Sequence, residues 1–462
     1  MPAEQVVVGG TMAALVAADA IAAQDRPVRL LVPERGVGGG FAALHRDGRT
    51  LELGVRLLEL DFEDTEPVSP PLDDYVAGTT TARPWARAIG DWVRELAGDG
   101  LREIARPEMV LDGRRADDVL FTVDLSALAG ALGATEREQM LAEVRHVLAT
   151  SGEDAGVLAP QAAGRFAAMT LEEASLANHG ATFHRRIIAP LCDKVLAGGA
   201  TAVSAPLRRK VWAPLFHPRT LAQALGGEPI AFRPSRSFHT ISPDGCGALV
   251  DTLLARLRAR PRATVETAGD LENAAATGGA VTLSFSDHAP ITTRRPILAL
   301  SADALFAATA VPYAVQRITT AIAWLEVDER DADGVPDLVH VLDADNPVLR
   351  VSRGGAGAPG RALLTVELRY DADPETLAAA ARRGLATAGL LADDVAVDTV
   401  MAARRPTFPV PDAATLSAFG AARERFDALG LDVELAGGGL DVTADTLNDQ
   451  ILQGLRASAR TS

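Results

Sequence analysis

The feature that most constrains the fold of this chain lies in its first 32 residues. A short apolar run at 6–8 leads into a turn of small residues, Gly9, Gly10 and Thr11, and then into an alanine-rich segment that begins at Met12. A second apolar run follows at 28–32. This order of strand, tight turn, helix and strand has the size of a βαβ unit that binds a dinucleotide. The first amides of such a helix point at a pyrophosphate because they have no partner within the helix.

Two further motifs follow the second apolar run. A glycine block occupies residues 36–40, and the triplet Glu52-Leu53-Gly54 comes shortly after it. With this order of elements, the N-terminal part resembles the FAD-dependent amine oxidase superfamily, which includes protoporphyrinogen oxidase, phytoene desaturase and, more distantly, UDP-galactopyranose mutase. The resemblance implies an α/β fold with a Rossmann-like FAD/NAD(P)-binding domain, and FAD as the cofactor.

The sequence departs from the family pattern at the positions that should face the cofactor. The family turn has glycine at three positions, which here are Gly9, Thr11 and Ala14. Thr11 places a β-branched side chain where the diphosphate would touch the backbone. The acid expected to hold the adenosine ribose falls on Val32, which cannot accept a hydrogen bond. Glu34, two residues on, can substitute for it if the strand ends later.

Charge and cysteine content narrow the classes of partner. The chain has 45 Lys and Arg against 61 Asp and Glu, a formal charge of −16, and no dense basic run. Nucleic acid and anionic membrane surfaces are therefore not expected as partners. Cys192 and Cys246 are too few and too far apart for a disulfide framework, which fits a reducing cytoplasm. No signal peptide is visible and no uncharged run reaches the roughly 18 residues of a membrane span.

The middle third of the chain has a different pattern. Residues 61–74 are acidic and proline-rich, as in a surface connection. From 84 to 226 the pattern predicts mainly helices, at 84–98, 125–132, 135–150, 170–176, 183–196 and 219–224. The segment 183–194 is similar to the helical substrate-domain region of the mutase and oxidase branch.

After this helical region the first domain is expected to resume. A helix is predicted at 248–258, followed by strands at 264–268, 280–285 and 296–300. By the resemblance, Val265 would hold the adenine end of the flavin through its backbone. An ordinary β-meander is the alternative interpretation of this stretch.

A second sheet is predicted from 312 to 370, with strands at 315–327, 338–342, 348–352 and 362–370 and a helix after it at 373–388. By the resemblance, this mixed sheet would form the wall that faces the flavin ring. Tyr313, Arg350 and Phe408 are then expected to line the substrate cavity. Arg350 would anchor an anionic group of the substrate.

The C-terminal part predicts a strand that runs into a glycine turn at 433–440, and then a helix at 446–455. This is similar to the closing motif of the superfamily, in which a polar residue of the turn contacts the ribityl chain and the pyrophosphate. Here that residue is Gly438 or Gly439, so only backbone amides remain to bind phosphate.

Other kinds of site are less favoured. The spacing of His179, His184 and Cys192 does not suit a helical metal site, and none is predicted. Ser204 and Ser242 lack the Gly-x-Ser-x-Gly pattern of an α/β-hydrolase nucleophile.

Together these patterns predict three parts: a discontinuous FAD-binding domain (1–65, 235–305 and 395–462), an inserted helical region (66–234), and a sheet and helix of the substrate domain (306–394). The leading hypothesis is a cytoplasmic FAD-dependent oxidoreductase that acts on a small organic substrate or biosynthetic intermediate. The alternatives are a flavin-free descendant that binds a ligand or accompanies a related flavoprotein, as a homo- or hetero-oligomer, and a cofactor-independent isomerase or cyclase. The residues expected to contact the cofactor are Gly9, Gly10, Thr11, Met12, Glu34, Arg35, Gly38, Gly39, Val265, Gly438, Gly439 and Leu447.

Overall fold

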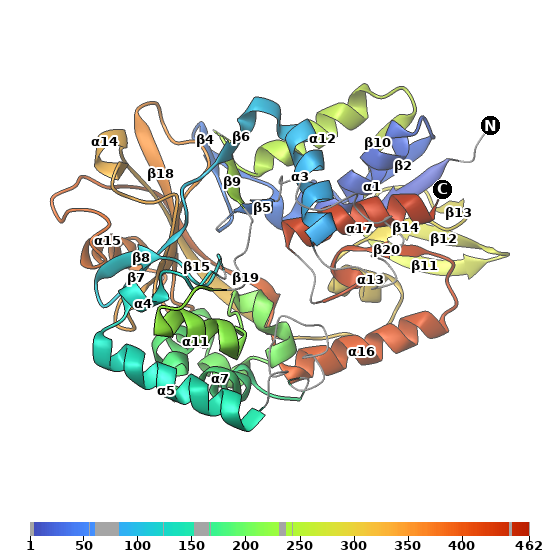
Figure 1. Cartoon of the computed structure of the whole chain (residues 1–462). Helices are drawn as coiled ribbons and strands as arrows, with labels where there is room; N and C mark the ends of the chain where they lie inside the picture. The colour runs from blue at the N-terminus through green and yellow to red at the C-terminus, as the bar shows by residue number, and fades with distance from the viewer. Residues whose placement is uncertain are drawn as a thin grey trace.

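A computed structural model describes residues 4–54, 56–60, 83–122, 124–151, 166, 168–230, 237–242, 244–442 and 446–461. It contains a parallel sheet with helices, a larger mixed sheet, and a helical region beside the mixed sheet, and these occupy the right, left and lower parts of Figure 1. The connection predicted at 61–74 lies outside the described residues.

The parallel sheet is built from both ends of the chain. Its strand order is β10-β2-β1-β14-β20, and every neighbouring pair is parallel. Because β1 and β2 are largely buried on both faces, their sequences are mostly apolar without polar alternation, and the exceptions are Gln5 and the half-buried Arg29. The five strands are β1 (Gln5–Val8), β2 (Val28–Val32), β10 (Ala263–Thr267), β14 (Ile297–Ala299) and β20 (Glu434–Ala436).

Helices cover one face of this sheet, and a small antiparallel sheet and two helices cover the other. On the first face α17 packs against α1 so closely that a Cβ added to Gly454 would lie 2.7 Å from the carbonyl oxygen of Ala13. The first face carries α1 (Met12–Ala23), α3 (Arg83–Ala97), α12 (Gly247–Ala259) and α17 (Leu447–Arg460). The second face carries β11 (Leu271–Thr277), β12 (Ala280–Phe285), β13 (Ile291–Thr293), α13 (Ala302–Ala308) and α16 (Ala413–Ala428). The sequence analysis did not predict α13 or α16.

The mixed sheet has seven strands in the order β19-β15-β18-β17-β16-β7-β8. All its neighbouring pairs are antiparallel except β16 with β7. One face packs on α15 (Leu377–Thr387), and the other faces the helical region. Its strands are β7 (Glu108–Leu111), β8 (Arg114–Asp117), β15 (Arg317–Asp328), β16 (Leu338–Val341), β17 (Val348–Arg353), β18 (Arg361–Leu368) and β19 (Asp398–Pro409).

The strands at 101–117 lie in a stretch where the sequence analysis predicted no element, between the helices predicted at 84–98 and 125–132. β7 and β8 form a hairpin whose two-residue turn has Asp112 at φ 53° and Gly113 at φ 66°. An Asp-Gly pair favours this type of turn because both residues tolerate positive φ. The mixed sheet thus includes β7 and β8, from the range 66–234, and β19, from the range 395–462. The domain ranges themselves stay a prediction.

The helical region lies beside the inner face of the mixed sheet, and Phe183, Ile318 and Leu349 belong to their common core. The turn before α9 is a π-helix, at a point where Pro190 has no amide hydrogen to donate to the preceding turn. The region consists of α4 (Leu128–Ala131), α5 (Ala134–Ser151), α7 (Leu171–His179), α8 (Ala181–Phe183), the π-helix η3 (His184–Ile188), α9 (Ala189–Val195), α10 (Gly199–Ala202), the 3-10 helix η4 (Ala205–Val211) and α11 (Pro218–Gly226).

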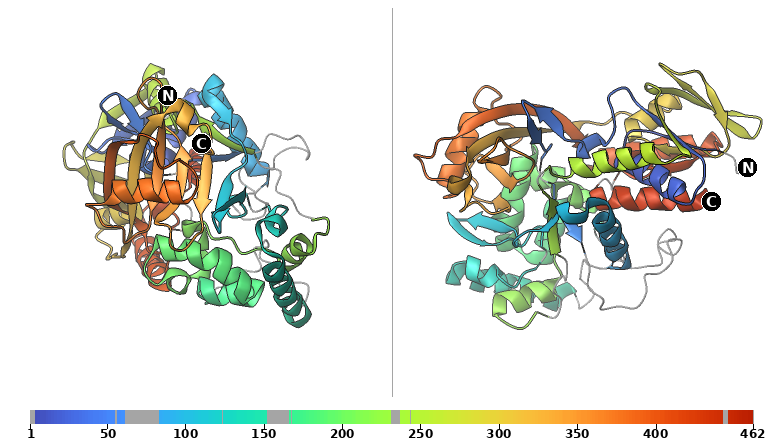
Figure 2. Two further views of the ribbon diagram at one scale, coloured as in Figure 1. Left: turned by 90° about the vertical axis from the view of Figure 1, so that its left-hand side faces the viewer. Right: turned by 90° about the horizontal axis from the view of Figure 1, so that it is seen from above.

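Two small sheets lie near the junction of the larger parts. They are the hairpin of β3 (Leu44–Arg46) with β4 (Arg49–Leu51), and the three-stranded sheet of β5 (Leu58–Leu60), β9 (Ser237–Ile241) and β6 (Leu101–Glu103). Seen from above, the two larger sheets lie at opposite ends of the molecule (Figure 2). Among the residues that the structure describes, no helix is long and apolar enough to cross a bilayer.

Candidate functional site

The turn between β1 and α1 has the backbone that the sequence predicted. Gly9 has φ +134°, and a Cβ added to it would overlap the carbonyl oxygen of Ala299 at the end of β14. Only glycine fits there. Gly10, Thr11 and Met12 follow at the carboxyl edge of the parallel sheet, which is where dinucleotides bind in such folds.

Side chains of the protein itself bind the first amides of α1. The Thr11 hydroxyl oxygen accepts a hydrogen bond from the Ala14 amide at 3.2 Å, and the hydroxyl donates to the Ala299 carbonyl at 3.0 Å. The Ala13 amide donates to Oε1 of Gln450 in α17 at 3.4 Å. Two amides at the start of the helix therefore already have acceptors.

The glycine block lies directly on this turn. The Gly38 amide donates to the Gly10 carbonyl at 2.6 Å. A Cβ added to Gly10 would lie 2.5 Å from the Gly36 carbonyl oxygen and 3.0 Å from Cδ of Pro33. Gly39 begins the 3-10 helix η1 (Gly39–Phe41) and is exposed. The loop after β2 thus covers Gly10 on the side opposite the sheet.

Other predicted cofactor contacts lie around the same edge, with different exposure. Val32 ends β2 and is 6% exposed, whereas Glu34 and Arg35 are exposed in the turn that follows. Val265 lies inside β10, two residues before that strand ends. Leu447 is the first residue of α17 and is buried.

The C-terminal glycine turn lies beside the end of β14. It forms the 3-10 helix η5 (Gly437–Gly439). The Gly437 amide donates to Oε1 of Gln453 at 2.6 Å, and the Gly439 amide donates to the Leu300 carbonyl at 2.9 Å. The nearest atom to a Cβ added at Gly438 is 3.6 Å away, so this position has space beside it. Gln453 is thus the second glutamine of α17, after Gln450, whose side chain accepts a hydrogen bond from a backbone amide at this edge of the sheet.

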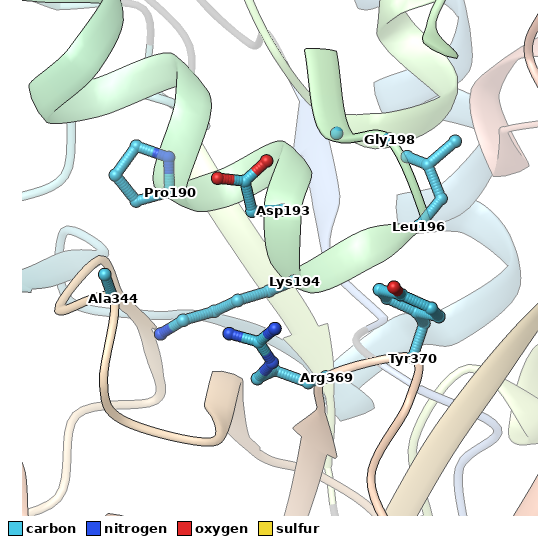
Figure 3. A pocket seen from close by; sticks show the side chains of 9 residues that line it. Pro190, Asp193, Lys194, Leu196, Gly198, Ala344, Arg369 and Tyr370 are labelled. Atoms are coloured by element: carbon cyan, nitrogen blue, oxygen red, sulfur yellow. The ribbon is translucent and has the colours of Figure 1, made fainter. Parts of the chain in front are cut away.

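A cavity of about 440 Å³, which we call the outer cavity, lies between α9 and the ends of β17 and β18. Figure 3 shows the Lys194 side chain running across it, with the Arg369 guanidinium below and the Tyr370 ring to one side. The outer cavity is lined by Pro190, Asp193, Lys194, Leu196, Gly198, Gly199, Ala344, Arg369 and Tyr370.

A smaller cavity of about 40 Å³, the inner cavity, adjoins the outer one at Lys194 and Tyr370, which line both. It lies between the helical region and the inner face of the mixed sheet. Its lining is Leu191, Lys194, Val195, Lys210, Val211, Trp212, Ile318, Thr319, Thr320, Leu349, Arg350, Glu367, Leu368, Tyr370 and Phe408.

Two buried ionisable pairs lie on this face of the sheet. Arg350 of β17 donates through Nη2 to Oε2 of Glu367 of β18 at 2.7 Å. His340 of β16 pairs with Arg350 in the strand register and has Nδ1 2.7 Å from Oδ2 of Asp118. Within the described residues, neither Nε of Arg350 nor Nε2 of His340 has a hydrogen-bond partner.

Two hydroxyls next to these pairs also lack a partner among the residues that the structure describes. Ser352 and Thr365 face each other across β17 and β18, two positions along from Arg350 and Glu367, and both are buried. Buried polar groups are usually satisfied by protein, water or ligand. Of the four residues with such atoms, Arg350 lines the inner cavity, and the other three are buried beside it without lining either cavity.

The structure separates the three residues predicted to line a substrate cavity. Arg350 and Phe408 both line the inner cavity. Tyr313 lines neither cavity, and packs instead against Phe306 and Phe419, with ring centroids 5.1 and 6.4 Å away. Its position just after α13, a helix that the sequence analysis did not predict, carries it beneath the parallel sheet.

His179 and Cys192 of the helical region are buried, and their contacts are structural. Nε2 of His179 accepts a hydrogen bond from the Phe216 amide at 2.7 Å, and burial lowers the pKa of this imidazole to about 3. Burial also raises the pKa of the Cys192 thiol well above its usual range, so the thiol stays protonated. In the described part of the chain, no group of three or more His, Cys, Asp or Glu side chains could hold a metal ion.

Comparison with solved structures identifies the fold. A reduced UDP-galactopyranose mutase superposes with a TM-score of 0.70 at 15% identity, over 100% of this chain and 94% of that one. The chain has the fold of the FAD-dependent amine oxidase superfamily. A putrescine oxidase variant (TM-score 0.58, 14% identity, 99% of this chain and 98% of that one) agrees with this. So does a CLA-producing fatty acid isomerase from P. acnes (0.56, 15%, 98% and 96%). No protein-family model and no curated protein matches the sequence.

The residues at the dinucleotide edge of this amine oxidase-like fold do not fit FAD in the usual way. The Ala13 and Ala14 amides are bonded to Gln450 and Thr11, and the Thr11 hydroxyl stands where the diphosphate would approach the turn. The buried end of β2 presents Val32, which offers no acceptor to a ribose. The turn keeps the backbone typical of the fold, and two amides at the start of α1 are bonded to side chains of the chain itself.

Sequence reasoning missed several polar groups at and near the two cavities. Glu367, which lines the inner cavity, and the buried pair of His340 and Asp118, which lines neither, became visible only in the structure because their partners are distant in sequence. Lys194 and Lys210 carried a signal, since they are the only two lysines in the chain, and both line the inner cavity.

Proposed function

We propose that this protein works without flavin and binds a small anionic molecule in the outer and inner cavities. The observation that carries the first part is the way α1 begins. Thr11 and Gln450 supply the acceptors that a diphosphate would otherwise supply to the Ala14 and Ala13 amides. A dinucleotide would have to displace both side chains and would still meet Val32 at the ribose position.

The charges that line the two cavities support an anionic ligand. Lys194, Lys210 and Arg369 bring basic side chains to the two cavities, and the Asp193 carboxylate also lines the outer one. Arg350 is paired with Glu367, and Arg369 with Asp371. Because the whole chain has a formal charge of −16, such a concentration of basic side chains does not follow from its overall composition. The volume of about 440 Å³ lies within the range of small-molecule sites, roughly 300–1,000 Å³.

The buried pair of His340 and Asp118 supports a reaction without electron transfer over simple binding. Nδ1 of His340 lies 2.7 Å from Oδ2 of Asp118, and an imidazole that donates from Nδ1 would leave Nε2 as an acceptor. An imidazole next to Arg350 in the strand register suits proton transfer, as in an isomerisation or a cyclisation, although His340 is fully buried and itself lines neither cavity. The proposed function is therefore that of a cofactor-independent isomerase or cyclase. A protein that binds the anion without transforming it is the simpler version of the same proposal.

The first experiment asks whether the protein holds flavin. The purified protein should be colourless, should release no FAD on denaturation, and should stay colourless after incubation with excess FAD and desalting. The variant Thr11→Gly/Val32→Glu/Gln450→Ala should gain FAD binding, because it frees the two amides and supplies an acid at the end of β2. Adding Gly9→Val to that variant should remove the gain. Stoichiometric FAD in the wild-type protein would contradict the proposal.

The second experiment asks whether the cavities bind anions. Pyruvate and inorganic phosphate, titrated separately in a calorimeter, should bind the wild-type protein. Arg369→Gln should weaken binding by about 10-fold to 100-fold, as expected for the loss of a charge-assisted hydrogen bond of roughly 1.5–3 kcal/mol. Arg330→Gln is the matched control, since the Arg330 side chain is 82% exposed and lines neither cavity. Equal affinity in both variants would refute the proposed site.

A second candidate is an FAD-dependent oxidoreductase that acts on a small organic substrate. One observation favours it: Gly9 and the start of α1 keep the backbone of a dinucleotide-binding turn at the carboxyl edge of the sheet. This candidate requires Thr11 and Gln450 to move when FAD enters, and a purified protein that is yellow would support it.

A flavin-free chain can also serve as the partner of a related flavoprotein. Size-exclusion chromatography of the two proteins together would test this.

A further inference from the structure

Lys194 occupies an unusual position for a lysine. It lies in α9, is 1% exposed, and donates through Nζ to the carbonyl oxygens of Val341 at 2.7 Å and Val348 at 2.8 Å. These carbonyls belong to the end of β16 and the start of β17. Two acceptors are as many as a neutral amine can serve, and they leave its lone pair unused.

The surroundings of this amine favour its neutral form. The pKa of Lys194 is lowered from 10.5 to about 7, mainly by burial; Asp343 acts in the opposite direction, and the Arg369 guanidinium contributes a smaller lowering. Figure 3 shows the Arg369 guanidinium next to the Lys194 side chain and the Asp193 carboxylate turned away from it. A large fraction of the chains therefore carry an uncharged amine near neutral pH, which is the nucleophilic form.

Composition argues that lysine is used here for its amine. Only two of the 45 basic residues are lysine, so arginine supplies nearly all of the positive charge in this protein. An arginine could also donate to two backbone carbonyls, but its guanidinium stays protonated and is not a nucleophile in proteins. Lys194 therefore provides a nucleophilic amine, which arginine cannot, and it lines a cavity large enough for a small molecule.

We propose that Lys194 captures the carbonyl carbon of a small anionic aldehyde or ketone, such as a 2-oxo acid, as an imine, while Arg369 binds the acid group. In this step the amine nitrogen attacks the carbonyl carbon, a C–N bond forms, the carbonyl C–O bond breaks, and the oxygen leaves as water with the two protons of the amine. The step is a condensation in which nothing is oxidised or reduced.

The inference rests on the proposed function for the presence of an anionic ligand in the outer cavity, and not on the absence of flavin. The experiment uses the full-length protein with pyruvate and sodium cyanoborohydride near neutral pH, followed by peptide mapping. One carboxyethyl adduct should appear at Lys194, with far less at Lys210 and at the N-terminal amine. Arg330→Lys adds a lysine at an exposed position and serves as the reference for unspecific modification. Its new lysine should react at least tenfold more slowly than Lys194.

Variants and binding data separate the possible outcomes. Lys194→Arg keeps N–H donors for Val341 and Val348 but has no nucleophilic amine, and it should lose the adduct while its far-ultraviolet circular dichroism stays unchanged. If Lys194→Arg does not fold, the wild-type peptide map still decides. Calorimetric binding of pyruvate without an adduct at Lys194 would overturn this inference and leave the proposed function standing. An adduct spread evenly over all amines, or one that forms only in denaturant, would also overturn it.

Discussion

A buried carboxyl at the junction of the two sheets makes the stability of this protein depend on pH. Glu52 follows β4 and is 3% exposed. Its Oε1 accepts a hydrogen bond from the Cys246 amide at 2.8 Å, and its own carbonyl accepts one from Nε1 of Trp324 at 2.7 Å. Burial is the largest influence on this group and raises its pKa from 4.5 to about 7, although the Cys246 amide and Arg56 act against it.

The sign and size of the effect follow from this pKa. In the unfolded chain the carboxyl loses its proton near pH 4.5, whereas in the folded chain it keeps the proton up to about pH 7. The folded state is therefore favoured most below pH 4.5, and this contribution is lost as the pH rises to 7. A difference of about 2.5 pKa units corresponds to about 3 kcal/mol at 1.36 kcal/mol per unit.

The test is Glu52→Gln, which cannot ionise. Urea unfolding followed by tryptophan fluorescence between pH 4 and 8 should show the variant gaining about 3 kcal/mol relative to the wild type across that interval. Glu329→Gln is the control, because the Glu329 side chain is 62% exposed and should change stability by less than about 0.5 kcal/mol at any pH. If the free energy of unfolding depended on pH in the same way in the wild type and in Glu52→Gln, the Glu52 carboxyl would not be the source of the pH dependence.

Three further predictions concern stability and use the same unfolding measurement. Gly454→Ala should lower the free energy of unfolding by about 1–3 kcal/mol, because its Cβ would lie 2.7 Å from the Ala13 carbonyl oxygen. Gly420→Ala in α16 is the control: its Cβ would meet nothing within 4 Å, so it should raise the free energy of unfolding by up to about 1 kcal/mol. Equal effects of the two substitutions would refute the close contact at Gly454. Asp118→Ala should cost about 1–3 kcal/mol by leaving Nδ1 of the buried His340 without its hydrogen-bond partner, and Asp427→Ala, in an exposed pair with Arg423, less than about 0.5 kcal/mol. As the pH rises from 7 to 10.5, the free energy of unfolding of the wild type should increase by about 5 kcal/mol relative to that of Lys194→Met. The reason is that in this interval Lys194 is protonated in the unfolded chain and deprotonated in the folded chain. A difference that does not change with pH would contradict the lowered pKa of Lys194.

Local sequence patterns predicted the first βαβ unit, and several of its helix and strand boundaries agree with the structure to the exact residue. The helix at 12–23 and the strand at 28–32 have the predicted bounds, because a continuous apolar run, a small-residue turn and an alanine-rich helix are all decided by neighbours in sequence. The Asp112-Gly113 hairpin was equally local and could have been predicted, had its turn signal been weighed against the helical pattern around it.

The candidate site could be predicted only in part, because its contacts join distant segments. Arg350 and Phe408 were placed at the cavity by resemblance, but the partner of Arg350 depends on the register of β17 with β18. Asp118 meets His340 across 222 residues of chain. The substitution of Gly by Thr11 was visible in the sequence, yet its hydrogen bond to Ala299 required coordinates.

The parallel sheet closes only when the last part of the chain joins the first, and this has a consequence during biosynthesis. α1 is synthesised before β14 and the 14 residues of α17, which cover part of its largely apolar surface. At about 5–20 residues per second, the ribosome takes roughly 20–90 s to make the intervening chain. For that time the surface of α1 that α17 covers in the folded protein stays exposed. A truncated product that lacks α17 never covers this surface, and the cell's proteases should remove it.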